Sequence, residues 1–410
     1  MNKLSFLHVF YILTCVSALQ IPFIGGIEVG PISLNSLKDV FIYVFLLWYI
    51  FDVYRLRYPV DGVFFYAFIV FSFFITLSLI VSPAIMSGVQ YFIKITFPFL
   101  VYYAIKYGSF RDVSLSEVIN NVLCVYILFC VVSLVLGGEQ DGVYAGVTDR
   151  HFFKFNAAFL FVLSFAVFAK NGYGIYQFVG LLVSLASILI VMQRGAFISV
   201  SIACFVILFL RGYLEGWRLF VSFLAISLAI FALFTNEKFV EYSFYEGMGP
   251  DYIISETLKG RFDVEFIRDR ERGVLMESIL DQHQFGFFPS GLGTAKSLIN
   301  NDYTFFEGKE PHNDLLVLAV DTGLGGFIIS VIMLCFIFFK VRAFHKVRRL
   351  VFESDAFLMF GVGSGLIFGY FVWMSFSNVV IYSSSSFALP FAFMAISERY
   401  INSKGYINGQ

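Results

Sequence analysis

The chain alternates between long apolar runs and short polar connections over most of its length. Backbone groups in lipid must pair within their own segment, and these runs are too continuous for barrel strands, so we expect helices. Crossing a hydrocarbon core of ~30 Å takes roughly 20 helical residues. Runs of about this length lie near residues 5–24, 39–54, 62–82, 85–106, 118–136, 152–170, 174–192, 195–211, 218–235, 322–340, 355–374 and 378–397. The pattern predicts an all-α, polytopic integral membrane protein with about twelve spans.

A long polar segment, residues 236–314, interrupts this pattern. It divides the chain into residues 1–235 with nine expected spans, the large loop itself, and residues 315–410 with three further spans and a tail. We expect the chemistry of the protein in this loop and at the membrane edges beside it.

Composition supports a membrane protein, because 59% of the 410 residues are hydrophobic and only 14% are charged. With both termini in the cytoplasm, fifteen Lys and Arg residues fall on the cytoplasmic side and four in the short outer loops. This bias predicts that residues 236–314 lie outside the membrane, in the periplasm of a Gram-negative cell. The chain is then expected in the bacterial inner membrane, with an uncleaved first span as its anchor.

Two short outer connections carry arginines at the expected membrane boundary. Arg194 lies in a tight connection, where its head group would seek an anionic partner such as a lipid phosphate. Arg150 precedes another span within an aromatic and basic cluster. For both residues the alternative is a structural one, a polar helix end or an interface anchor.

Inside the long loop, the apolar spacing after Glu271 predicts an amphipathic helix, followed by a glycine-rich turn at residues 288–293. Arg272 lies at the start of this helix and is a candidate for binding an anionic group at the membrane surface. Arg270 is kept as a substrate-binding candidate, with a solvated salt-bridge face as its alternative. The loop holds eight basic and fifteen acidic residues, so an anion site must be built from particular arginines.

His312 and Asn313 precede a leucine-rich helix that leads to Asp321 and to the spaced glycines at 323, 325 and 326. These glycines permit a break or close packing where the chain enters the bilayer. A single histidine at a membrane edge is either a catalytic group or a structural one. Asn313 and Asp321 are candidate substrate contacts, and the alternative for Asp321 is that it stabilises the packing of its helix.

Lys94 is an ionisable residue near the middle of an expected span. Such a charge faces a cavity or a partner in most membrane proteins. It could meet an anionic head group inside the bundle, pair with a carbonyl, or extend to the interface. The acidic pair around Arg270 is too weak a pattern for a metal site, since no His or Cys cluster accompanies it, and no metal is expected.

Taken together, Arg194-Gly195, Arg272 with its apolar helix, Gly291-Leu292-Gly293, and His312-Asn313 followed by Leu315, Asp321, Gly323 and Gly326 resemble the superfamily of O-antigen polymerases (Wzy) and O-antigen ligases. The family's last segment has His-Asn, a leucine-rich helix, an acidic residue and Gly-Leu-x-Gly. Here Asp321 stands where Glu is more common.

The resemblance implies a metal-independent, membrane-embedded glycosyltransferase whose donor is an oligosaccharide on undecaprenyl pyrophosphate. It implies that Arg194 and Arg272, with Arg150, stabilise the charge that grows on the pyrophosphate, and that His312 is a base or an orienting group for the acceptor hydroxyl. No cofactor is expected, because the lipid pyrophosphate stores the energy of transfer. The expected partners are the lipid-linked oligosaccharide, membrane lipids and a chain-length regulator protein, with no nucleic acid.

The sequence leaves the acceptor open. A polymerase moves the growing glycan onto a lipid-linked repeat unit, and a ligase moves it onto lipid A core. The divergent, Phe-rich body and Asp321 favour the polymerase. A flippase of lipid-linked glycan would explain the many spans and Lys94, but it predicts titratable groups along a central cavity. A structural or sensory protein would leave the placement of His312 and Arg272 without a reason.

Overall fold

A computed structural model describes the larger part of the chain. The described residues are 28–29, 32–33, 43–44, 47, 62–107, 114–140, 143–146, 150–172, 174–191, 194–213, 259, 272–302, 313–351, 354–375 and 380–403.

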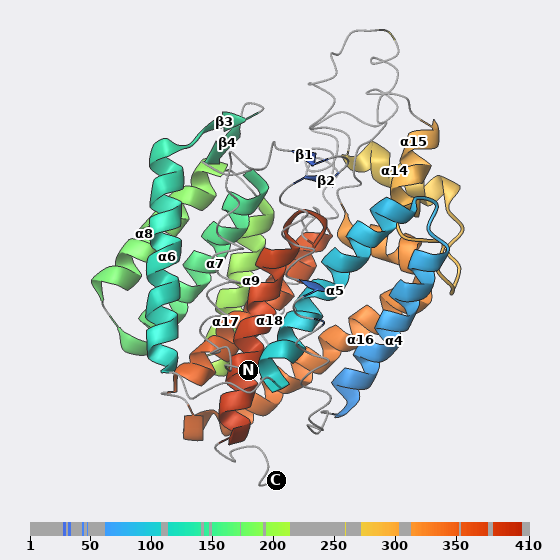
Figure 1. The fold of residues 1–410 in the computed structure, drawn as a ribbon. Coiled ribbons are helices and arrows are strands. Elements are labelled where there is room, and N and C mark those ends of the chain that lie inside the picture. Colours follow the sequence, from blue (N-terminus) through green and yellow to red (C-terminus); the bar gives the residue numbers. More distant parts are fainter. Residues whose placement is uncertain are drawn as a thin grey trace.

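Helices dominate the described part of the chain (Figure 1). They are α4 (Gly62–Ile80), α5 (Ile85–Tyr107), α6 (Leu115–Leu136), α7 (Arg150–Asn171), α8 (Ile175–Val191), α9 (Arg194–Leu210), α14 (Arg272–Gln282), α15 (Thr294–Asp302), α16 (Asp314–Val351), α17 (Asp355–Met374) and α18 (Val380–Ser403). Two small antiparallel strand pairs accompany them, β1 (Glu28–Val29) with β2 (Ile32–Ser33) and β3 (Gly138–Gln140) with β4 (Val143–Gly146).

Five helices in the described residues are long and apolar enough to cross a membrane. They run over Ile85–Tyr107, Leu115–Leu136, Phe153–Asn171, Asp314–Arg348 and Asp355–Met374, and three shorter apolar helices accompany them. The predominantly helical fold is therefore confirmed, and these helices are compatible with a membrane-embedded protein. The spans expected at 5–24 and 218–235, and most of 39–54, lie outside the described residues, so the count of twelve and the periplasmic loop stay predictions.

Helix α17 occupies the centre of the bundle, between α9 and α18. Small residues explain how closely it approaches its neighbours. A Cβ atom on Gly365 would lie 2.9 Å from the backbone of Ala203 in α9, and one on Gly363 would lie 2.5 Å from the carbonyl oxygen of Pro390 in α18. Packing between helices in lipid depends on such close backbone contact, since burial from water supplies little driving force there.

Helices α14 and α15 lie together at one end of the bundle, which we call the loop end; β3 and β4 lie at the same end (Figure 1). Helix α7 follows β4 and packs against α8 and α9, so the first residues of α7 and α9 both lie there. Helix α16 also begins at the loop end, because Asn313 contacts α14. The starts of α7, α9, α14, α15 and α16 therefore lie at the loop end.

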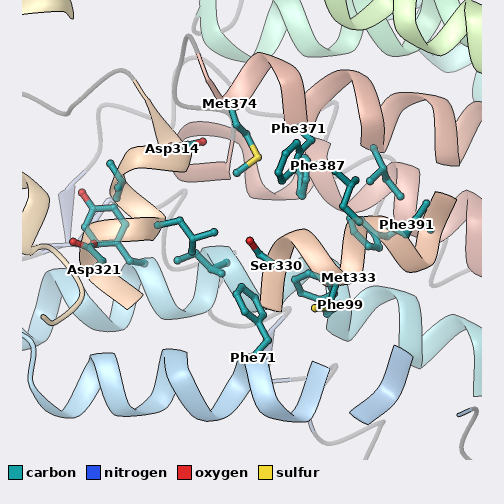
Figure 2. Close-up of a pocket in the computed structure, with 17 residues that line it drawn as sticks. Phe71, Phe99, Asp314, Asp321, Ser330, Met333, Phe371, Met374, Phe387 and Phe391 are labelled. Carbon is teal, nitrogen blue, oxygen red and sulfur yellow. The ribbon is translucent and has the colours of Figure 1, made fainter. Parts of the chain in front are cut away.

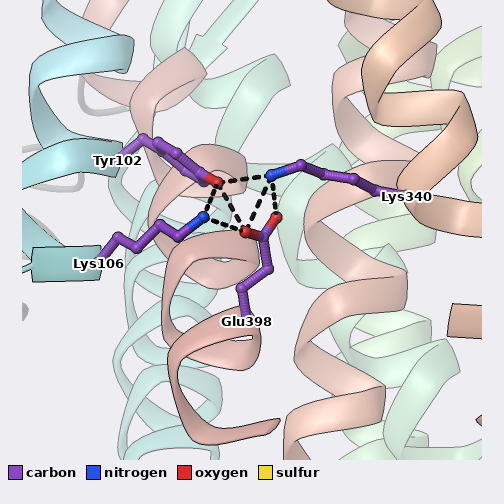
Figure 3. Close-up of polar contacts among 4 residues, drawn as sticks. All are labelled: Tyr102, Lys106, Lys340 and Glu398. Atoms are coloured by element: carbon purple, nitrogen blue, oxygen red, sulfur yellow. Dashed lines mark hydrogen bonds and ion pairs between the residues drawn. The ribbon is translucent and has the colours of Figure 1, made fainter. Parts of the chain in front are cut away.

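A charged cluster joins three helices at the end of α5 that lies away from the loop end (Figure 3). Glu398 of α18 accepts hydrogen bonds from Lys106 of α5 at 2.8 Å and from Lys340 of α16 at 2.8 Å. Tyr102 donates to the same carboxylate at 2.7 Å. Glu398 and Lys106 are buried, so this is not a surface ion pair. The cluster holds α5, α16 and α18 together.

Candidate functional site at the loop end

A cavity of about 90 Å³ lies between α4, α5, α16, α17 and α18 (Figure 2). Its wall is almost entirely apolar and aromatic, with Phe71, Phe99, Phe371, Phe387 and Phe391 among its lining residues. Asp314 and Asp321 both line the cavity, at separate positions away from Phe387 and Phe391 (Figure 2). The cavity is larger than the ~15 Å³ that a single water needs, so it has room for part of a ligand.

Helix α16 is broken two residues after Asp321. Gly323 has φ of +71° and ψ of 171°, a conformation that glycine adopts without strain. The break frees backbone groups, which must find partners within the protein. Leu324 and Gly325 donate their N–H groups to the carbonyls of Gly286 and Phe287, at 2.9 and 3.0 Å. The break permitted by the sequence is confirmed, and a loop from between α14 and α15 fills it.

Asp321 binds the end of the same loop that leads into α15. It is 1% exposed, and its two carboxylate oxygens accept the backbone N–H groups of Gly293 at 2.8 Å and Ala295 at 2.9 Å. These amides begin α15, whose helix dipole favours a negative charge at that position. These hydrogen bonds stabilise the start of α15, and a substrate contact of Asp321 stays a prediction. The span expected at residues 322–340 is part of a longer helix that already includes this aspartate.

Asn313 caps the start of α16. Its side-chain oxygen accepts the backbone N–H of Leu316 at 2.9 Å, as is typical of an asparagine before a helix. Its amide nitrogen lies 3.8 Å from the sulfur of Met276 in α14. Asn313, expected as a substrate contact, thus fixes where α16 begins relative to α14. His312 lies outside the described residues.

The arginines predicted from the sequence begin helices at the loop end. Arg150, Arg194 and Arg272 are the first residues of α7, α9 and α14, and their side chains lie outside the described part of the structure. Helices α7 and α9 pack against each other, so the backbones of Arg150 and Arg194 are brought to the same side of the bundle. Arg272 lies with α14, on the side of α16. Arg270 lies outside the described residues.

Lys154 was counted among the outer-loop cations but not selected from the sequence as a site residue. It lies one turn into α7, is 2% exposed, and places its ammonium group 5.4 Å from the centre of the Trp373 ring and 5.3 Å from that of Phe155. Gly195, next to Arg194, leaves no room for a side chain beside Trp373. The signal in the sequence is a lysine inside an aromatic run, which alone does not distinguish a buried cation from an interface anchor.

Lys94 lies within α5 with a partly exposed side chain, and it does not belong to the residues that line the cavity. Its expected role as a charge facing a cavity therefore has no support from this pocket. Among the residues that the structure describes, no three His, Cys, Asp or Glu side chains gather into a possible metal site.

The C-terminal end of α17 contacts both the starts of α7 and α9 and the cavity beside the start of α16. Trp373 contacts Lys154 and lies against the start of α9, while its neighbour Met374 lines the cavity together with Asp314. Two consecutive residues thus separate a buried cation from a buried carboxylate. Comparison with protein-family models and with curated proteins finds no match to this chain.

Proposed function

We propose that this protein is a membrane-embedded glycosyltransferase that polymerises a surface polysaccharide such as O-antigen. It transfers the growing glycan from undecaprenyl pyrophosphate to a lipid-linked repeat unit at the loop end, on the periplasmic side of the inner membrane. The reaction needs no cofactor, because the bond to the pyrophosphate carries the energy. A chain-length regulator protein is the expected partner.

The observation that carries this proposal is that the backbones of two arginines lie near a buried lysine on one side of the loop end, which we call the cationic pole. Arg150 and Arg194 begin two helices that pack side by side, and Lys154 is buried one turn below the first of them. Helix starts favour anions, since their N–H groups and dipole are directed outward. A lipid pyrophosphate at the membrane boundary is a ligand that suits this pole, because it brings several negative charges to a water-poor position.

Catalysis follows from where charge develops. The bond between the sugar's anomeric carbon and the pyrophosphate oxygen breaks, so negative charge grows on the leaving group in the transition state. Arg194 and Arg272 stabilise that charge, an effect of several kcal/mol when donors are preorganised in a site with little water. His312, immediately before the cap of α16, acts on the hydroxyl that attacks the anomeric carbon. Asn313 and Asp321 hold the helix starts around this reaction.

The proposal is tested by lipopolysaccharide electrophoresis of a strain in which the gene is deleted, with a plasmid-borne copy as the control. A core that carries a single repeat unit is the expected result. Bare core, with long glycan left on the lipid carrier, would identify a ligase instead. An unchanged ladder would contradict a role in glycan assembly.

A further inference from the structure

We propose that Asp314 binds the acceptor hydroxyl and takes its proton. This inference rests on the proposed function and adds a catalytic residue to it. Asp314 lies two positions after His312, which then orients the hydroxyl rather than removing its proton.

The first observation is the place of Asp314 in the fold. It is the first residue of α16, is 4% exposed, and lines the cavity at the end away from Phe387 and Phe391. Placing a carboxylate against an apolar wall costs desolvation free energy, so its position there calls for a reason. Carboxylates that are buried beside a cavity are therefore candidates for proton transfer.

A structural explanation is available, because an acidic residue in the first turn of a helix interacts favourably with the helix dipole. The chain provides a direct comparison in Asp355. It is the first residue of α17 and follows the cap Ser354, as Asp314 follows the cap Asn313. The side chain of Asp355 is 26% exposed and pairs with Lys170. Dipole stabilisation does not require the deeper burial of Asp314 against a cavity.

The second carboxylate of the cavity has a different task. Both oxygens of Asp321 accept backbone N–H groups at the start of α15, and these contacts hold the loop in the break of α16. Protonating Asp321 would weaken both hydrogen bonds. Asp321 therefore has a structural task, and Asp314 is the other carboxylate that lines the cavity.

The position of Asp314 also fits the expected placement of donor and acceptor. Met374 borders the cavity beside Asp314, and Trp373 contacts Lys154 at the cationic pole. The donor pyrophosphate, held at that pole, and the acceptor hydroxyl, held at Asp314, would meet beside the end of α17, since the attacking oxygen must come within bonding distance of the anomeric carbon.

The proposed step is balanced. The acceptor O–H bond breaks and its proton goes to the Asp314 carboxylate, while the acceptor oxygen forms a bond with the anomeric carbon. The bond from that carbon to the pyrophosphate oxygen breaks, and the leaving group keeps the electron pair. The proton then passes from Asp314 to the released lipid pyrophosphate, which restores the carboxylate.

The experiment uses the full-length protein in liposomes with a lipid pyrophosphate-linked repeat unit from the source strain as donor and acceptor. Four proteins are compared: the wild type, Asp314→Asn, Asp314→Glu and the matched control Asp355→Asn. Polymer formation gives kcat and KM, and thermal unfolding shows whether each variant is folded. The expected result for Asp314→Asn is a loss of roughly 100- to 10,000-fold in kcat, with little change in KM or in the unfolding temperature.

Asp314→Glu is expected to retain part of the activity, and Asp355→Asn to match the wild type. Equal effects of Asp314→Asn and Asp355→Asn would mean that Asp314 serves only the helix start, and a wild-type kcat in Asp314→Asn would also overturn the inference. If Asp314→Asn does not fold, Asp314→Glu decides: a folded Glu variant with a lowered kcat supports the inference, and one with wild-type kcat overturns it. A wild-type protein that forms no polymer from the lipid-linked unit would instead refute the proposed function.

Discussion

The Asp321 carboxylate accepts the backbone N–H of Gly293 at 2.8 Å, although 28 positions separate the two residues. This contact joins a membrane helix to the loop that fills its break. The backbone carbonyl of Asp321 also accepts the N–H of Gly291 at 3.2 Å. The loop end is therefore organised around one residue of α16, and the first predictions concern its stability.

Replacing Asp321 with alanine should lower the free energy of unfolding by about 2–4 kcal/mol. The reason is that two buried N–H groups, of Gly293 and Ala295, would lose their acceptor. Thermal unfolding in detergent measures the effect. Asp281→Ala, at an exposed position on α14, is the control and should leave the unfolding temperature unchanged. An equally stable Asp321→Ala protein would show that the amides find other partners.

Gly323→Ala should destabilise the protein more than Gly172→Ala. Both glycines have positive φ, +71° and +76°, so both substitutions carry a conformational cost of about 1–2 kcal/mol. A Cβ on Gly323 would also collide with the backbone carbonyl of Phe288, whereas nothing lies within 4 Å of one on Gly172. The difference between the two unfolding temperatures reports the close approach of the loop together with the more restricted backbone conformation at Gly323, where ψ is 171°. Equal shifts would argue against it.

Glu398→Gln should cost about 3–5 kcal/mol, because the buried Lys106 and the partly buried Lys340 would lose the carboxylate between them. Asp355→Asn removes the more exposed pair with Lys170 and should cost no more than about 1 kcal/mol. Unfolding in detergent compares the two. If both substitutions had the same small effect, the cluster would not fasten α5, α16 and α18.

Arg194→Ala, Arg272→Ala and His312→Ala should each abolish long glycan chains while the amount of protein in the membrane stays the same. Losing a contact to the transition state does not unfold a helix bundle. Arg270→Ala is the comparison and should be mild. Electrophoresis of lipopolysaccharide and immunoblotting of the membrane fraction provide both readings. Full-length chains in the Arg194 and Arg272 variants would refute the pyrophosphate assignment.

Lys154→Met should reduce chain formation as strongly as Arg194→Ala, because it removes the buried cation beside Trp373 but keeps an unbranched side chain of similar length. Lys154→Arg should retain more activity, since it keeps the charge. Glycan chain length and membrane abundance are measured together. A fully active Lys154→Met protein would show that Lys154 contributes only to packing.

The sequence predicted much of the helical framework. Long apolar runs mark the segments that can lie in lipid or in a protein interior, and hydropathy measures these runs directly. The run at 85–106 corresponds to α5, and the run at 355–374 has the same bounds as α17. The start of α14 at Arg272 agrees with the amphipathic spacing after Glu271. The start of α16 did not follow from hydropathy, because Asp314 and Asp321 are polar and their acceptance into a buried helix depends on partners elsewhere.

The site residues divide in the same way. Arg150, Arg194 and Arg272 were selected because a cationic residue at the end of an apolar run can be recognised from the sequence alone. Lys154 and Asp314 were visible too, but nothing local distinguishes a lysine beside a tryptophan more than 200 positions away from an ordinary interface anchor. The possible break at Gly323 was predicted from glycine spacing, whereas the loop that fills it was not.

By itself, the sequence determined that the chain is membrane-embedded and helical, and where most of its described helices run. The length and polarity of each segment are local properties that a bilayer selects directly. Only the tertiary structure decided that Asp321 fastens the start of α15, that Glu398 joins two lysines, and that Trp373 and Met374 separate Lys154 from Asp314. These relationships depend on which helices pack together, and buried polar groups are stable only where distant parts of the chain bring partners to them.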